Sequence, residues 1–132
     1  MSGAVYLDSS ALVKLVAVEQ ESEDLRGHLQ DRETWIASAL VVVEVGRALV
    51  RRPDADASIA SNVLDRLVLV DVDRRILERA ASLAPAELRS LDAIHVATAI
   101  EVRESIEDVV TYDARLTAAA RLHGFRTTAP GS

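Results

Sequence analysis

The chain has 132 residues, of which 49% are hydrophobic, enough for one domain with a buried core and too apolar for a disordered chain. It contains no cysteine, which excludes a disulfide framework and any cysteine-ligated metal site. A net charge of −6 argues against a broad basic surface for nucleic acid, although carboxylates gathered in one metal site would account for much of it.

The sequence carries no recognisable signal for crossing or entering a membrane. No apolar run approaches the roughly 20 residues of a membrane helix. The N-terminus also lacks the basic and hydrophobic regions of a signal peptide. We therefore expect a cytoplasmic protein without a membrane contact, which forms a single domain over residues 1–132.

Short β-prone runs alternate with amphipathic helical patterns along the whole chain. The predicted strands lie at residues 5–7, 34–37, 67–72, 108–111 and 125–128. The predicted helices lie at residues 11–18, 22–31, 38–52, 54–67, 74–83, 90–100 and 114–123. Such alternation implies right-handed crossovers and a parallel sheet with helices on both faces. The sequence thus predicts an α/β fold, a three-layer α/β/α sandwich around a central parallel sheet.

Several helix ends carry a local signal. Ser9 and Ser10 are expected to cap the first helix, and Ser38 and Asp73 are expected to cap later ones. Gly124 is expected to close the last long helix, because glycine adopts the left-handed conformation that ends many helices.

Four acidic residues are predicted to lie at one edge of the sheet, each within apolar sequence. Asp8 ends the first strand, where open α/β sheets bind their ligands. Asp113 follows the fourth strand, Glu44 lies on the second turn of helix 38–52, and Asp92 lies in the first turn of helix 90–100. A buried carboxylate is costly unless it is paired, hydrogen-bonded or bound to a metal.

Each of these acids also has a purely structural explanation. Asp8 and Asp113 could each cap the helix that follows. Asp92, in the first turn of helix 90–100, could complement the helix dipole. Glu44 could form an ion pair with an arginine on its own helix, either Arg47 or Arg51.

Taken together, the four acids favour a metal site. Carboxylates that share one edge repel each other, and no basic residue nearby in sequence could neutralise all of them. Oxygen-only ligands suit Mg²⁺ or Mn²⁺. Such an ion can activate water for attack on a phosphodiester.

Three further polar residues lie close to these acids in the sequence. Ser10 and Thr111 are each two residues from one of the carboxylates, so either hydroxyl could orient a carboxylate. Helix capping is nevertheless the first expectation for Ser10. His95, one turn after Asp92, is interpreted as a core residue without a catalytic role.

At this point the chain resembles the PIN-domain ribonucleases, specifically VapC-type toxins of bacterial toxin–antitoxin pairs. The resemblance covers nearly the whole length and rests on four segments in order. These are residues 5–14 (VYLDSSALVK), 38–45 (SALVVVEV), 90–99 (SLDAIHVATA) and 111–113 (TYD).

The resemblance implies a three-layer α/β/α fold and a Mg²⁺- or Mn²⁺-dependent endoribonuclease activity. In that activity a metal-activated water attacks the phosphorus of RNA in line. It assigns catalysis and metal binding to Asp8, Glu44, Asp92 and Asp113. It also implies a homodimer and inhibition by a small VapB-type antitoxin.

Three alternative functions remain open from the sequence. A phosphoacceptor receiver domain could use Asp71 as acceptor, but it needs a late lysine, and no lysine follows Lys14. A von Willebrand A-type adhesion module needs Asp-x-Ser-x-Ser, of which Asp8 and Ser10 supply only the first half. A catalytically inactive interaction domain of the same fold is the third, because fold does not fix function.

Overall fold

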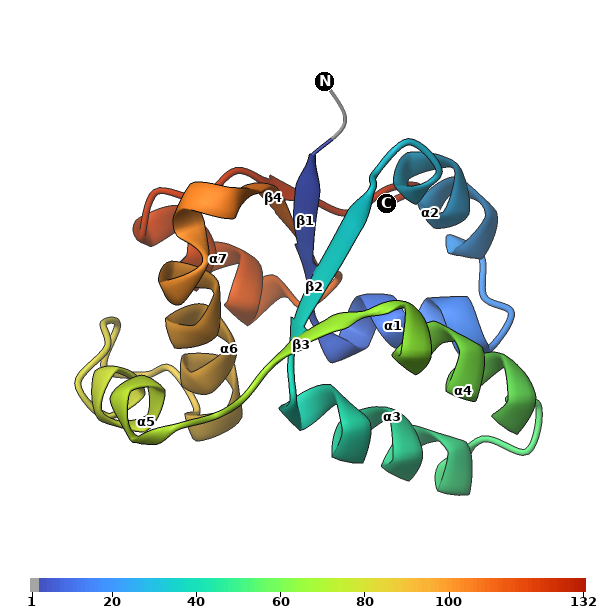
Figure 1. Ribbon diagram of the computed structural model, residues 1–132, viewed down its shortest axis with the longest axis horizontal. Coiled ribbons are helices and arrows are strands. Elements are labelled where there is room, and N and C mark those ends of the chain that lie inside the picture. Colours follow the sequence, from blue (N-terminus) through green and yellow to red (C-terminus); the bar gives the residue numbers. More distant parts are fainter. Residues whose placement is uncertain (1–2) are drawn as a thin grey trace.

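The chain folds around a five-stranded sheet in which every strand runs parallel to its neighbours (Figure 1). The computed structural model describes residues 3–132. The strands are β1 (Ala4–Leu7), β2 (Thr34–Ser38), β3 (Val68–Val70), β4 (Ile106–Val110) and β5 (Thr127–Thr128). They lie in the order β3–β2–β1–β4–β5, so β1 is central and β2 and β4 flank it.

Helices cover both faces of this sheet. They are α1 (Ser9–Val16), α2 (Ser22–Leu29), α3 (Leu40–Arg51), α4 (Ala57–Arg66), α5 (Arg74–Ala81), α6 (Ser90–Glu101) and α7 (Ala114–Leu122), with a short 3₁₀ helix (Arg103–Ser105) before β4. The first four helices pack over one face, α6 and α7 pack over the other, and α5 packs against α6 (Figure 1). The predicted three-layer α/β/α sandwich with a parallel sheet is therefore confirmed.

The central strand is buried on both faces, as its apolar sequence predicts. Val5, Tyr6 and Leu7 are fully buried. Because side chains alternate along a strand, Val5 and Leu7 join the core under α1–α4, whereas Tyr6 joins the core on the opposite face. The chain thus leaves the sheet at Asp8 from a strand held on both sides.

The first helix is capped by a different residue from those predicted. Asp8 is the N-cap of α1, and its carboxylate accepts a hydrogen bond from the backbone N–H of Ala11 at 3.0 Å. Ser9 and Ser10 already belong to the helix. The acid caps the helix because the chain is still extended at Asp8, which lets its side chain reach the third amide of the helix.

The remaining predicted helix ends are mostly confirmed. Asp73 caps α5, and Gly124 follows α7 with a left-handed φ of 89°. Ser38 is not the N-cap of α3: it stays in β2, where it pairs with Val70, and Ala39 takes the N-cap position. Because Ser38 pairs within the sheet, α3 begins one residue later than predicted.

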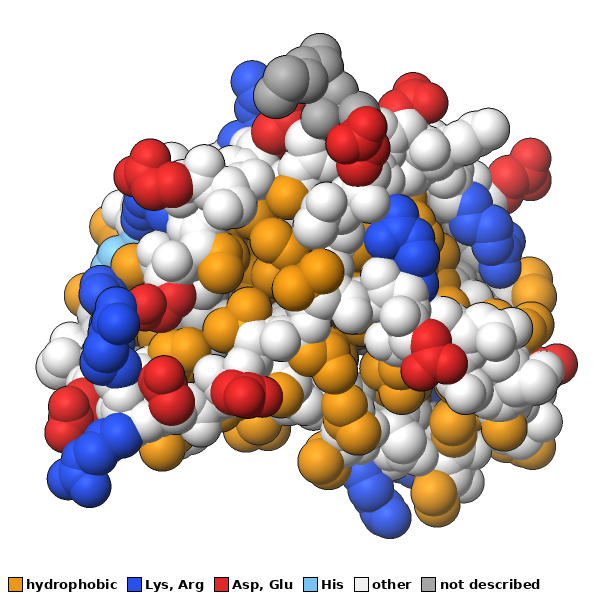
Figure 2. All heavy atoms as spheres, in the orientation of Figure 1, with side chains coloured by type: hydrophobic (Ala, Val, Ile, Leu, Met, Phe, Trp, Pro, Cys, Tyr) orange, Lys and Arg blue, Asp and Glu red, His pale blue; other side chains and the backbone are white. Residues whose placement is uncertain are grey.

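The predicted domain over residues 1–132 includes Met1 and Ser2, which lie outside the described residues. Within residues 3–132, no helix is both long enough and apolar enough to cross a bilayer. The face drawn in Figure 2 carries acidic and basic side chains interspersed around an apolar middle, as expected for a chain whose charge argues against a broad basic surface.

Candidate active site

The four predicted site residues come from four separate segments. Asp8 follows β1 and caps α1, and Asp113 follows β4 and caps α7. Asp92 lies in the first turn of α6, and Glu44 lies on α3 and contacts α6 through His95. Since β1 and β4 are neighbouring parallel strands, their carboxyl ends place the first two acids at the same edge of the sheet.

Asp8 is held from three sides. The residue is 3% exposed, and its Oδ1 accepts hydrogen bonds from Ser10 Oγ at 2.7 Å and from the backbone N–H of Ala11 at 3.0 Å. Oδ2 accepts a hydrogen bond from Thr111 Oγ1 at 2.5 Å. Burial raises the pKa of Asp8, and these hydrogen bonds only partly oppose that rise. The carboxylate is thus fixed in position while its negative charge is poorly compensated.

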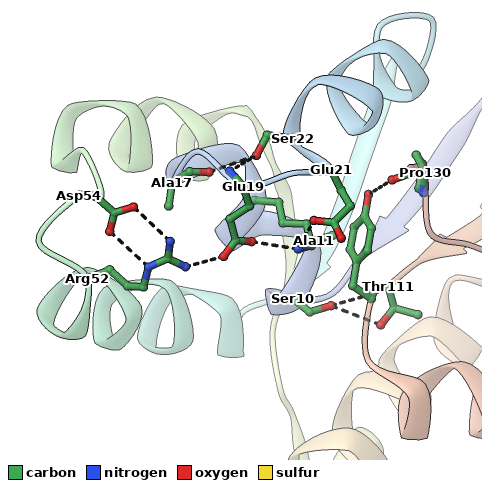
Figure 3. Close-up of polar contacts among 12 residues, drawn as sticks. Ser10, Ala11, Ala17, Glu19, Glu21, Ser22, Arg52, Asp54, Thr111 and Pro130 are labelled. Carbon is green, nitrogen blue, oxygen red and sulfur yellow. Dashed lines mark hydrogen bonds and ion pairs between the residues drawn. The ribbon is translucent and has the colours of Figure 1, made fainter. Parts of the chain in front are cut away.

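Ser10 and Thr111 link this carboxylate to the segment that follows β4. Ser10 Oγ donates to Asp8 and accepts from the backbone N–H of Tyr112 at 2.9 Å. Thr111 Oγ1 donates to Asp8 and accepts from the backbone N–H of Asp113 at 3.1 Å. The capping role expected first for Ser10 is wrong, since its hydroxyl joins two segments far apart in the sequence (Figure 3).

Asp113 and Asp92 lie nearer the surface and affect one another. Asp113 caps α7 through Oδ1, which accepts from the backbone N–H groups of Arg115 at 2.8 Å and Leu116 at 3.0 Å. Burial raises the pKa of Asp92, and the negative charges of Asp113 and Glu44 raise it further. Three of the four acids are therefore close enough for mutual repulsion to change a pKa.

Glu44 pairs with a histidine instead of an arginine. His95 Nε2 lies 2.8 Å from Glu44 Oε1, and His95 Nδ1 lies 2.8 Å from the hydroxyl of Tyr6. The suggested pairing of Glu44 with Arg47 or Arg51 is wrong for the described residues. Sequence reasoning left His95 without a role, although a histidine inside an otherwise apolar helix needs buried hydrogen-bond partners.

The only lysine of the chain forms ion pairs with acids outside the candidate site. Lys14 Nζ lies 2.9 Å from both Glu19 Oε1 and Glu21 Oε1, and 4.8 Å from the centre of the Tyr112 ring. Arg52 extends this network through a 2.6 Å contact with Glu19 (Figure 3). In the described part of the chain, no lysine or arginine forms an ion pair with any of the four site acids.

The chemistry of this donor set fits a hard divalent cation, although the side chains do not form a compact cage. Within residues 3–132, no three acidic or histidine side chains are placed to hold a metal ion as they stand. The shared metal site expected for Asp8, Glu44, Asp92 and Asp113 stays a prediction. Mg²⁺ binds through one or two carboxylates and keeps several waters, so clustered, uncompensated carboxylates still suit it.

Comparisons with known proteins agree with this fold. A family model for the PIN domain matches residues 5–122. Ribonuclease VapC46 from Mycobacterium tuberculosis is 43% identical over 127 residues, which cover 96% of this chain and 98% of that protein.

Two solved structures share the architecture at low sequence identity. A toxin–antitoxin complex from Klebsiella pneumoniae matches with a TM-score of 0.70 and 19% identity, covering 86% of this chain and 90% of that chain. VapC20 from Mycobacterium tuberculosis, a sarcin–ricin loop cleaving toxin, matches with a TM-score of 0.70 and 17% identity, covering 92% and 95%. These two structures share the fold. The family model and the 43% identical relative show that the chain belongs to the PIN domain family, among its VapC-type members.

Proposed function

We propose that this chain is a divalent-metal-dependent endoribonuclease and the toxin of a type II toxin–antitoxin pair. One observation supports the proposal: Asp8 is buried and hydrogen-bonded by Ser10 and Thr111 at the carboxyl edge of the sheet, and no lysine or arginine of the described residues forms an ion pair with it or with the three other acids. Relatives named as VapC ribonucleases support the same activity.

The four acids, Asp8, Glu44, Asp92 and Asp113, would hold Mg²⁺ or Mn²⁺. Such an ion supplies charge stabilisation at the phosphoryl oxygens and makes hydroxide available at neutral pH. The protein's own contribution is positional. Thr111 and Ser10 keep the Asp8 carboxylate in one orientation, and the Asp113 carboxylate is fixed because it caps α7. Both carboxylates are therefore oriented before a ligand binds.

A groove beside this edge offers a path for RNA. It has a volume of about 500 Å³, lies between α7 and the segment before α6, and has Arg89 and Arg115 among its lining residues. Neither guanidinium forms an ion pair within residues 3–132, and the charge of Arg115 lowers the pKa of Asp92. Arginine binds phosphate oxygens through two parallel hydrogen bonds, so these side chains suit an RNA backbone passing the acids.

The partner of this chain would be a VapB-type antitoxin that brings an arginine or lysine to the acidic edge. A guanidinium among the carboxylates would compete with the ion and block the phosphate. A groove of about 550 Å³ lined by Leu15, Gly27 and Trp35, among others, lies in the region of α1 and α2 where we expect the antitoxin to dock. A homodimer and a cytoplasmic location complete the proposal.

The test is cleavage of RNA by the purified protein, with Asp8→Asn as the matched variant. We expect cleavage in Mg²⁺ or Mn²⁺, none in EDTA, no rescue by zinc at the same free concentration, and no cleavage by the variant. Full activity in excess EDTA would rule the mechanism out. Sequencing the 5′ ends of RNA after brief induction in cells would then identify the target.

The alternative is a catalytically inactive PIN-like binding domain. The observation in its favour is that the site acids do not form a compact metal cage within residues 3–132. The same assay decides, because an inactive domain would bind RNA or a protein without metal-dependent cleavage under any condition.

A further inference from the structure

A chain of buried hydrogen bonds leads from the core to the acidic edge. The hydroxyl of Tyr6, on the central strand, lies 2.8 Å from His95 Nδ1, and His95 Nε2 lies 2.8 Å from Glu44 Oε1. Tyr6 is fully buried and His95 is 2% exposed, whereas the Glu44 side chain is 21% exposed. The three residues therefore connect a rigid strand to a carboxylate at the surface.

The direction of these hydrogen bonds follows from their chemistry. A tyrosine hydroxyl carries its proton at neutral pH, so the Tyr6 hydroxyl, 2.8 Å from His95 Nδ1, can donate to that nitrogen. His95 then carries its own proton on Nε2 and donates it to Glu44. The opposite tautomer would set a nitrogen lone pair against the carboxylate. Tyr6 thus fixes the tautomer that Glu44 requires.

We propose that His95 is a positioning residue for Glu44, an inference that rests on the proposed metal-dependent nuclease. The imidazole holds Oε1 of Glu44 in place, which would leave Oε2 available to a bound ion. Among the described residues, no arginine or lysine restrains this glutamate. A long side chain fixed before binding loses less conformational freedom when the ligand arrives, which favours binding.

Two substitutions at position 95 separate this role from a purely structural one. A glutamine amide reaches about as far as imidazole Nε2, whereas an asparagine amide reaches about as far as Nδ1. His95→Gln can therefore still donate to Glu44 but loses Tyr6, and His95→Asn does the opposite. Both variants leave a polar group in the same buried position, so they carry similar structural penalties.

The experiment measures Mn²⁺ binding by electron paramagnetic resonance, together with kcat and KM for a cleaved RNA. We expect His95→Asn to weaken Mn²⁺ binding by about 10- to 100-fold and to lower kcat more than it changes KM, with His95→Gln losing less than about tenfold. Val96→Ala is the control: this neighbour is buried on α6, so its loss lowers stability without touching Glu44.

The outcomes are distinguishable. If His95→Asn binds Mn²⁺ like the parent, or if the loss of binding merely follows thermal stability across all variants, the positioning role is wrong. If His95→Asn does not fold, His95→Leu takes its place, because it also removes the donor to Glu44; Mn²⁺ binding and kcat equal to the parent's in that variant would overturn the inference. A parent protein that neither binds Mn²⁺ nor cleaves RNA would overturn the proposed function first and this inference with it.

Discussion

Thr111 Oγ1 donates a 2.5 Å hydrogen bond to Asp8 Oδ2 and thereby joins residues 103 positions apart in the sequence. Thr111 is 1% exposed and follows β4, whereas Asp8 follows β1. The same hydroxyl oxygen accepts from the backbone N–H of Asp113. The Thr111 side chain thus sets the position of Asp8, the most buried of the four site acids, and of the segment that carries Asp113.

Replacing this threonine by valine should damage the site without changing its volume. Thr111→Val leaves a buried carboxylate oxygen without its donor, so we expect a loss of about 1–3 kcal/mol in the free energy of unfolding. Cleavage should fall by about 10- to 100-fold, the usual cost of removing a residue that orients a metal ligand. Urea unfolding in EDTA and kcat in Mg²⁺ measure the two effects. Thr111→Ser keeps the hydroxyl and should stay close to the parent; equal losses in both variants would show that only packing matters.

Local sequence patterns predicted the positions of Asp8, Asp92 and Asp113, because each of these acids lies where a strand ends or a helix begins; Glu44 lies inside α3. Asp8 and Asp113 follow apolar strands, and parallel strands place such residues at one edge. Their capping roles are local as well, and both were recognised as possibilities. The alternation of strands and helices was sufficient to predict the layered fold.

The contacts between distant segments could not be read from the sequence. Ser10 has every property of a helix cap, yet its hydroxyl is directed toward Tyr112, 102 positions away. Glu44 has arginines at helical spacing but pairs with His95 on another helix. In each case packing of α1, α3 and α6 around the sheet decides the partner, and local spacing contains no information about it.

Neutralising Asp8 should abolish cleavage and leave the fold intact. Burial raises the pKa of Asp8, so the folded protein keeps this proton over a range where the unfolded chain has released it. Without metal, this group therefore lowers stability as pH rises from its unfolded pKa, about 3.9, through the raised folded value. At neutral pH in EDTA, Asp8→Asn should match or exceed the parent in thermal stability.

In Mg²⁺ the parent should become more stable than Asp8→Asn. The parent should gain stability because the ion binds only its folded state, and the gain of Asp8→Asn should shrink. Cleavage by the variant should drop by at least about 100-fold. A variant much less stable in EDTA, with the parent's Mg²⁺ response intact, would show that Asp8 is only a helix cap.

The ion pairs around Glu19 should make the free energy of unfolding fall as the pH becomes acidic. The Arg52 guanidinium and the Lys14 ammonium hold the pKa of Glu19 below its usual range. This contribution is present above the unfolded pKa of about 4.3 and disappears as pH falls through the lower folded value. Glu19→Gln should lower the free energy of unfolding by roughly 1 kcal/mol at pH 7, with no difference at the acid end. Asp65→Asn, an exposed acid on α4, is the control, and a pH-independent loss in Glu19→Gln would contradict the explanation.

The groove lined by Arg89 and Arg115 should affect the binding of RNA more than the rate of cleavage. Arg89→Gln and Arg115→Gln each remove a charge that faces the expected path of RNA. We expect KM to rise by roughly tenfold in the double variant, about 1.4 kcal/mol, while kcat changes little, because phosphate contacts away from the reacting centre add uniform binding. The slope of log binding affinity against log salt should become shallower by about 0.7 for each arginine lost.

Arg126→Gln is the matched control for this groove. This exposed arginine directly precedes β5, the edge strand beside β4, and does not line the groove. It carries the same charge, so its loss changes the net charge equally without touching the groove. If all three arginine substitutions raised KM alike, the effect would come from net charge alone. If the groove variants lowered kcat with KM unchanged, the two arginines would act on the acidic edge itself, where the charge of Arg115 already lowers the pKa of Asp92.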